Sequence, residues 1–511
     1  MISHIAILPV ICPLLTGTLL LLLQKRSLQT VRLISIASVS VLVVLAGYLL
    51  NIVSDGEILV YELGNWPPPF GIVLVADRLA VWMLFITALV SMFALLYATQ
   101  GTDSDGPHFH ALFQLQLFGL NGAFLTGDLF NLFVFFEILL LASYGLLLHG
   151  GGRLRTMAGL HFVIINLVGS TLFLFAVGTL YGLLGTLNMA DLAVKAARAA
   201  DEDIALIRTA GLLLFAVFAL KAALLPLYLW LPAAYAHTTA PVAALFAIMT
   251  KVGAYSILRV YTLIFGSQAG NVSDLIDPWL LPLALATLIA GVLGVLASTY
   301  LRQQIAYLVI ASIGTLLIAF GINTHTSIAA GLFYLPHSTF AAAAFFLLAD
   351  IIATRRLEIN DRFEPGPVIP HQRLTGALFF IAAILIAGLP PLSGFIGKLL
   401  ILQAALPHTA LPWIMGAMLI TSLFTIIALA RSGSMLFYRA QLQQASHTAT
   451  GINSQQALTP GFSGLAIVVC LLALCAALTI GAGIISEFTL ATANQLLQPE
   501  NYIYSVLGTA K

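Results

Sequence analysis

Long apolar runs alternate along this chain with short polar connectors. A helix needs ~20 mostly apolar residues to cross the hydrocarbon core of a bilayer. By this rule we expect fourteen membrane-spanning helices, so the fold class is all-α and polytopic. The helices are predicted near residues 4–23, 30–53, 78–98, 110–127, 129–148, 158–183, 205–235, 241–262, 279–299, 304–322, 327–352, 374–405, 411–438 and 462–483.

The polar segments between these runs are short. Residues 56–77 contain two β-type runs around a WPPP turn, which predicts a small hairpin outside the membrane. Residues 188–203 have the pattern of an amphipathic helix that lies on the membrane surface. The Gly-rich connector at 149–156 lacks the lysine and the spacing of a phosphate-binding loop. A further connector is predicted at 447–460.

Composition agrees with a membrane protein. Only 8% of the 511 residues are charged, 60% are hydrophobic, and the mean hydropathy is +1.03. So little polarity would not cover the surface of a soluble domain. A net charge of +1 argues against a nucleic-acid partner. The three cysteines provide neither a disulfide framework nor a metal motif, so we expect no metal and no cofactor.

Charge bias sets the expected orientation. The first run lacks the features of a signal peptide, so it is kept as a span. With the N-terminus outside, basic residues are more frequent in the inner loops than outside, as the positive-inside rule requires. An even number of spans then places both termini on the outer face. The inner residues are Lys25, Arg26, Arg32, Arg153, Arg155, Arg302, Arg355, Arg356, Arg362, Arg373, Arg431 and Arg439, and the outer ones are Arg78, Lys195, Arg198, Arg208, Arg259 and Lys511.

The seventh and twelfth spans are too long for one crossing and contain prolines. Lys221 precedes Pro226 in the seventh, and Lys398 follows Pro391 in the twelfth. Proline removes a backbone donor, so both helices should break inside the membrane. Because the two spans are five apart, they cross in opposite directions, which predicts two inverted five-helix repeats. The expected units are 1–109, 110–265, 278–440 and 441–511.

Four ionisable residues lie deep within apolar runs: Glu137, Lys221, Lys251 and Lys398. Such groups are costly in a bilayer and usually mark an ion or proton path. Desolvation and neighbouring cations favour the neutral form of a lysine, so these lysines are candidates for proton exchange near neutral pH. Glu137 and Lys221 are expected to form a pair. The alternatives are a purely structural ion pair and, for Lys398, a side chain that reaches the membrane surface.

Three further residues complete the predicted proton path. His337 is the histidine deep within a span, and it can carry protons at neutral pH. His237, at the inner end of the broken seventh span, is a candidate for proton uptake, and Asp350 is a second candidate. The competing interpretation is that each is an ordinary hydrogen-bonded or solvated residue. A metal-cation cage would need several buried carboxylates, so the pattern favours protons as the ion that this chain carries.

Several motifs resemble a known family. FFEILLLASYGLL, LKAALLPLYLWLPAAYAHTTAPV, IMTKVGAYSILRVY, FYLPHSTFAAAAFFLLADII and GLPPLSGFIGKLLIL contain the residues above. They are similar to segments of the antiporter-like subunits of respiratory complex I and of Mrp-type multisubunit cation/proton antiporters. The resemblance covers nearly the whole chain. Within the family, YELGNWPPPFGIVLVADRLAVWML and the lysine at position 398 resemble the D-type subunit of Mrp antiporters.

The resemblance implies a fourteen-helix fold with two inverted repeats in a bacterial inner membrane. It implies that Glu137 and Lys221 are a coupling pair, that Lys251 is a central relay and that Lys398 is the terminal residue. It also implies that His337 takes part in proton translocation. It also implies sodium/proton exchange, performed only together with other subunits. The chain is then a transporter subunit and not an enzyme.

Two other functions remain open at this point. The same proton path would also serve a redox pump such as complex I or a membrane-bound hydrogenase, driven by electron transfer in other subunits. A solitary transporter of an organic cation is the third alternative, and it predicts activity from the isolated chain. The subunits that accompany the chain distinguish these possibilities.

Overall fold

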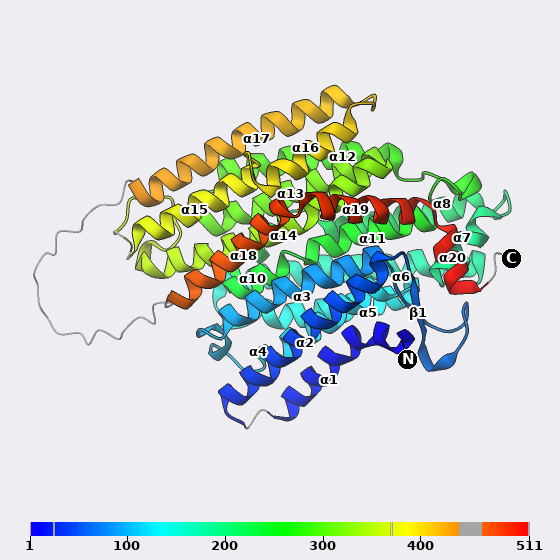
Figure 1. Ribbon diagram of the computed structural model, residues 1–511, viewed down its shortest axis with the longest axis horizontal. Coiled ribbons are helices and arrows are strands. Elements are labelled where there is room, and N and C mark those ends of the chain that lie inside the picture. Colours follow the sequence, from blue (N-terminus) through cyan, green and yellow to red (C-terminus); the bar gives the residue numbers. More distant parts are fainter. Residues whose placement is uncertain (1, 24–25, 368, 370, 439–461, 509–511) are drawn as a thin grey trace, which may run out of the picture.

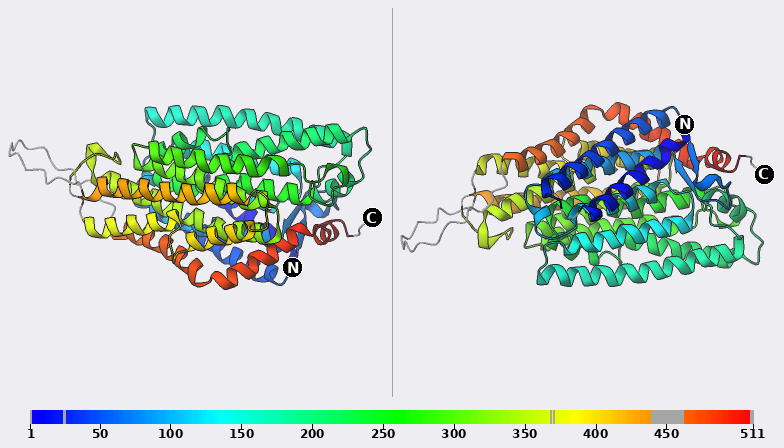
Figure 2. Two further views of the ribbon diagram at one scale, coloured as in Figure 1. Left: turned by 90° about the horizontal axis from the view of Figure 1, so that it is seen from above. Right: turned by 90° about the horizontal axis from the view of Figure 1, so that it is seen from below.

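The computed structural model describes residues 2–23, 26–367, 369, 371–438 and 462–508. The described chain is a bundle of long helices, and Figure 2 shows them side by side along the longest axis of the molecule. Helices satisfy their own backbone hydrogen bonds, as a segment surrounded by lipid must. Among the described residues, twelve helices are long and apolar enough to cross a membrane. The other two predicted spans correspond to α4 (Phe109–Leu125) and to the shorter pair α15 (Gln372–Ala387) and α16 (Ser393–Ala405).

Three long helices and a hairpin come before the predicted repeats (Figure 1). The strands β1 and β2 pair antiparallel, with Leu59 opposite Ala76, so the predicted hairpin is confirmed. Asp77 follows β2 and caps the next helix by accepting a hydrogen bond from the backbone N–H of Ala80. The elements are α1 (Leu8–Leu22), α2 (Leu28–Ser54), β1 (Leu59–Glu62), β2 (Val73–Ala76) and α3 (Arg78–Ala98).

Two halves of five membrane segments each follow. In each half the fourth membrane segment is broken, as the prolines predict. The first half comprises α4, α5 (Leu129–Leu148), α6 (Arg153–Leu184), the surface helix α7 (Met189–Ala197), the broken pair α8 (Ile204–Ala222) and α9 (Trp230–His237), α10 (Ala240–Phe246) and α11 (Met249–Leu263). The second comprises α12 (Asp277–Ala297), α13 (Leu301–Ile322), α14 (His325–Arg355), the broken pair α15 and α16, and α17 (Leu411–Gly433).

Two features differ from the expectation. The eighth predicted span is interrupted at Ala247 and Ile248, between α10 and α11, although this stretch contains neither proline nor glycine. After the last predicted span, α18 (Phe462–Ile480), the tail forms α19 (Ala482–Leu497) and α20 (Glu500–Leu507). The buried residues of α19 are Thr489, Thr492, Ala493 and Leu496, a helical spacing that packs against α14 and α11. The connector predicted at 447–460 lies outside the described residues.

Loops that are predicted to lie on the same side of the membrane meet at the same end of the bundle. Arg32 and His110 both bind Asp103 in the turn after α3, and His149 binds the carbonyl of Thr102. We call this the inner end, following the predicted orientation. At the opposite, outer end lie the hairpin, α7, α20 and the N- and C-terminal parts of the described chain (Figure 1).

The ion pair of Arg32 with Asp103 is expected to stabilise the inner end of the bundle. Arg32 donates two hydrogen bonds to the Asp103 carboxylate, of 2.6 and 2.7 Å. Burial raises the pKa of Asp103, but hydrogen bonds from His110 and Arg32 outweigh it and hold the pKa below its ordinary value. A lowered carboxyl pKa stabilises the fold above the unfolded pKa, and that contribution is lost as the pH falls through the folded pKa.

We therefore expect Arg32→Met to destabilise the protein near pH 7 by about 3 kcal/mol, because it leaves a buried carboxylate with one partner fewer. The difference from the native protein should narrow below about pH 4. Thermal unfolding of the purified protein at the two pH values measures both effects. Lys195→Met is the control, because its partly exposed pair with Asp191 on the surface helix α7 should contribute at most ~1 kcal/mol. If the difference in stability between Arg32→Met and the native protein grew at low pH, the ion pair of Arg32 with Asp103 would not be its cause.

Candidate functional site

The break in the first half places Lys221 at the end of a helix. α8 ends one residue later, and Ala223 adopts a left-handed conformation with φ of 58°. The Nζ atom of Lys221 donates a hydrogen bond of 2.9 Å to Oδ1 of Asn166 on α6, and it lies 5.9 Å from the centroid of the Phe136 ring. A cavity of about 20 Å³ next to Lys221, Asn166 and Trp230 has room for a water molecule.

Glu137 does not pair directly with Lys221. Its carboxylate accepts a hydrogen bond from Ser170, which lies one helical turn after Asn166 on α6. No ion pair joins Glu137 and Lys221, which are both described. The two groups are therefore not in direct contact in this structure, and α6 binds each of them through a different side chain, Ser170 and Asn166. Asn166 and Ser170 were missed, although their spacing of four residues in an apolar span is a signal for one helix face.

Lys251 is the third residue of α11 and is fully buried. Its Nζ atom has no hydrogen-bond partner among the described residues, and neither has Oγ1 of Thr250. A buried polar group without partners is costly, so Lys251 is an exception that calls for a functional explanation. α11 approaches α8 closely here: a Cβ atom on Gly253 would lie 2.3 Å from the backbone N of Ala222. The two lysines of the first half therefore lie on directly packed helices.

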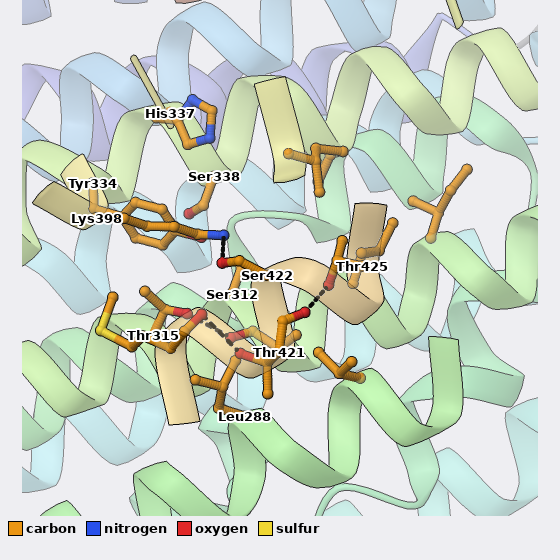
Figure 3. A pocket seen from close by; sticks show the side chains of 17 residues that line it. Leu288, Ser312, Thr315, Tyr334, His337, Ser338, Lys398, Thr421, Ser422 and Thr425 are labelled. Carbon is orange, nitrogen blue, oxygen red and sulfur yellow. Dashed lines mark hydrogen bonds between the residues drawn. The ribbon is translucent and has the colours of Figure 1, made fainter. Parts of the chain in front are cut away.

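The break in the second half brings Lys398 and His337 to one cavity. Lys398 Nζ donates to the backbone oxygen of Ala387, at the end of α15, and to Oγ of Ser422 on α17, at 2.9 and 3.0 Å. Nδ1 of His337 lies 2.9 Å from Oγ of Ser393, the first residue of α16. Figure 3 shows Lys398 extending toward Ser422, with His337 on the neighbouring α14. The cavity measures about 30 Å³, which is room for water.

Hydroxyl groups line this second cavity. Besides the lysine and the histidine, its polar wall includes Ser312, Thr315, Tyr334, Ser338, Thr421 and Thr425. Hydroxyl groups can both donate and accept hydrogen bonds, so they suit a short chain of water molecules. His337 on α14 and Lys398 on α16 therefore line one cavity together with these hydroxyl groups.

The two predicted uptake residues lie at the inner end and have different surroundings. His237 lines a cavity of about 600 Å³ together with Arg302 and Asp361. Asp350 is already occupied: it pairs with Arg302 at 2.6 Å and accepts a hydrogen bond of 2.8 Å from the hydroxyl of Tyr97. His237 thus faces an open space, whereas Asp350 is held by an arginine that lines the same space.

Sequence reasoning also missed a buried ion pair. Arg259 was counted among the outer basic residues, but it is buried and its Nη2 atom donates to Oδ1 of Asp77 at 2.6 Å. The only signal in the sequence was its spacing, since Lys251, Tyr255 and Arg259 recur every fourth residue and share one face of α11.

Comparisons with known proteins place the chain in a family. Residues 126–425 match the family described as NADH:quinone oxidoreductase/Mrp antiporter, transmembrane. The chain is 40% identical to a probable K⁺/H⁺ antiporter D-type subunit of Rhizobium meliloti, over 100% of this chain and 98% of that one. It is 38% identical to a Na⁺/H⁺ antiporter D-type subunit of Alkalihalophilus pseudofirmus, over 99% of each chain.

Solved structures agree with this match. A chain of the Mrp complex from Dietzia is 27% identical and superposes with a TM-score of 0.86, over 99% of both chains. A chain of respiratory complex I from Thermus thermophilus, 24% identical, superposes with a TM-score of 0.75 over 96% of this chain and 99% of that one, and so shares the fold. The sequence motifs, the two broken helices and these matches lead to one conclusion. This multi-pass membrane protein belongs to the family of antiporter-like subunits shared by NADH:quinone oxidoreductases and Mrp antiporters.

Proposed function

We propose that this chain is the proton-translocating, D-type subunit of a multisubunit monovalent cation/proton antiporter in a bacterial inner membrane, with both termini on the outer face. The observation that supports it most is Lys251, a fully buried lysine without a hydrogen-bond partner among the described residues. On this proposal it links a first site at Lys221 with a second at His337 and Lys398. A structural lysine would have its donors satisfied, whereas a relay needs a group that can bind and release a proton.

The proposed route starts at the inner cavity beside His237 and passes through Lys221. Near Lys221 the carboxylate of Glu137, which accepts a hydrogen bond from Ser170, adjusts the local charge. The route continues through Lys251 and His337 to Lys398. Each helix break supplies unpaired backbone groups and space for water, which lower the cost of an ionisable group at membrane depth. The chain is on this proposal a transporter subunit and not an enzyme.

A redox pump is the second candidate, because complex I shares the fold. The relatives at 36–40% identity are named antiporter subunits, which favours the first candidate. Their names differ in the cation, K⁺ in one and Na⁺ in the others. We expect Na⁺ for this chain and place the passage of the cation itself elsewhere in the complex.

The test is purification of the tagged chain from its native membrane in mild detergent, with identification of every subunit that accompanies it. The complex is then reconstituted, and proton movement is measured with Na⁺ or K⁺ gradients. Antiporter subunits and Na⁺-dependent proton movement support the proposal. Cluster- or quinone-binding partners and no cation-dependent proton movement would replace it with the redox pump.

His237→Ala should reduce antiport in part and shift its pH optimum, because the histidine lines the inner cavity without blocking it. Initial rates in vesicles from pH 6 to 9 measure the change. His108→Asn is the matched control, since His108 is an exposed inner histidine with a left-handed backbone that asparagine tolerates. If the pH profile of His237→Ala equals that of the control, His237 lies outside the path.

A further inference from the structure

The outer end of α11 contains a buried cluster that the proposed route does not use. Arg259 is 4% exposed and Asp77, the N-cap of α3, is 1% exposed. The guanidinium group of Arg259 donates to Asp77 and lies 5.2 Å from the Tyr502 ring of α20 and 5.7 Å from the Tyr255 ring. We call Asp77, Tyr255, Arg259 and Tyr502 the outer plug.

The outer plug lies between a cavity at the outer end and the buried Lys251. On its outer side, a cavity of about 470 Å³ is lined by Tyr261 and Thr262, which are two and three residues beyond Arg259 on α11. On its inner side, Nζ of Lys251 and Oγ1 of Thr250 are buried without partners among the described residues. Lys251 and Arg259 are eight residues apart, so their backbones lie ~12 Å apart on one helix face.

Each member of the plug is fixed by a different element. Asp77 accepts from both Arg259 and the backbone N–H of Ala80. The hydroxyl of Tyr255 donates to the backbone oxygen of Phe124 on α4 at 2.6 Å. α3, α4, α11 and α20 therefore meet at one ionic contact. A buried pair held this way is poor at exchanging protons, because arginine keeps its proton under all ordinary conditions.

We propose that the outer plug closes the outer end of the first half, so that a proton on Lys251 passes only toward His337 and Lys398. Arg259 is on this proposal a positioning residue for proton transport: it relays no proton, because it stays protonated, and it prevents the release of protons toward the outer solution. The inference rests on the proposed function of the chain as a proton carrier.

The first experiment neutralises the plug without emptying it, with the double variant Asp77→Asn and Arg259→Gln. In vesicles that contain the whole complex and no cation gradient, passive proton entry should rise clearly above that of the native complex, because the two neutral amides no longer form the ion pair that joins α3 to α11. Antiport should fall because its protons leak. Arg208→Gln, which removes an exposed outer arginine, is the matched control and should stay proton-tight.

The second experiment leaves the pair intact and measures access. Serine replaces the three native cysteines, Cys12, Cys470 and Cys475. A single cysteine is then introduced either on the outer side of the plug, as Thr262→Cys, or on its inner side, as Val252→Cys. Silver ions added from the outer side should react with the thiol at 262 and spare the one at 252. The double plug variant should expose position 252.

These results separate the plug from the proposed function. A proton-tight double variant that assembles, or reaction at 252 as fast as at 262 in the native plug, overturns the plug. If the double variant does not assemble, the access experiment decides alone. A native complex without cation-dependent proton movement would instead overturn the proposed function, and the thiol results would still show whether the outer end is closed.

Discussion

Replacing Lys221 by methionine should reduce cation-dependent proton transport by about a hundredfold or more, while the complex still assembles. Methionine keeps the length of the side chain but cannot bind a proton. The change leaves Asn166 with an unused acceptor next to a water-sized cavity, which limits the structural cost. The loss should therefore be one of transport and not of folding, and antiport rates beside a gel-filtration profile of the complex measure both.

Lys195→Met is the matched control. Lys195 is 41% exposed on the surface helix α7 and forms a partly exposed pair with Asp191, so its loss should leave transport within error of the native rate. Native transport in the Lys221 variant would mean that this lysine has only a structural role. Equal loss in both variants would indicate a general sensitivity to lost charge.

The second large effect is expected at Gly253, where no side chain fits. A Cβ atom would lie 2.3 Å from the backbone N of Ala222 and 2.7 Å from the backbone C of Lys221. Gly253→Ala must push α11 away from the end of α8, and overpacking of this kind typically costs about 1–3 kcal/mol. Because the shift occurs between Lys221 and Lys251, antiport should fall by at least about tenfold, the usual result of misplacing reacting groups by a fraction of an ångström to ~1 Å.

Gly178→Ala provides the control, since nothing lies within 4 Å of a Cβ atom at that position of α6. Alanine is also the better helix former, so this variant should be as stable as the native chain or slightly more so. Thermal unfolding and antiport are measured for both variants. A Gly253→Ala protein with native stability and rate would show that the close approach of α8 and α11 is not needed.

Much of the fold follows from local signals in the sequence. The apolar runs predict the long helices, and the β-type runs around the WPPP turn predict the hairpin, because each pattern is a direct consequence of burial. The breaks near Pro226 and Pro391 follow from the missing backbone donor of proline. The sequence alone also identifies the four ionisable residues that lie deep within apolar runs.

The missed features depend on packing between distant segments. The interruption at Ala247 and Ile248 contains neither proline nor glycine, so no local signal in the sequence predicts it. Glu137 binds Ser170 and not Lys221 because α6 lies beside both. Arg259 resembles an outer flanking residue until Asp77, far away in sequence, is seen to face it.

On the proposed route, protons cross from the first half to the second through Lys251. The most direct measurement is proton movement in liposomes that contain the purified complex with Lys251→Met, driven by an imposed Na⁺ or K⁺ gradient and compared with the native complex. We expect the native complex to move protons in response to the gradient and the assembled variant to move none above the level of empty liposomes. Proton movement at the native rate in the variant would contradict the proposed route, because the two halves would then be connected without Lys251.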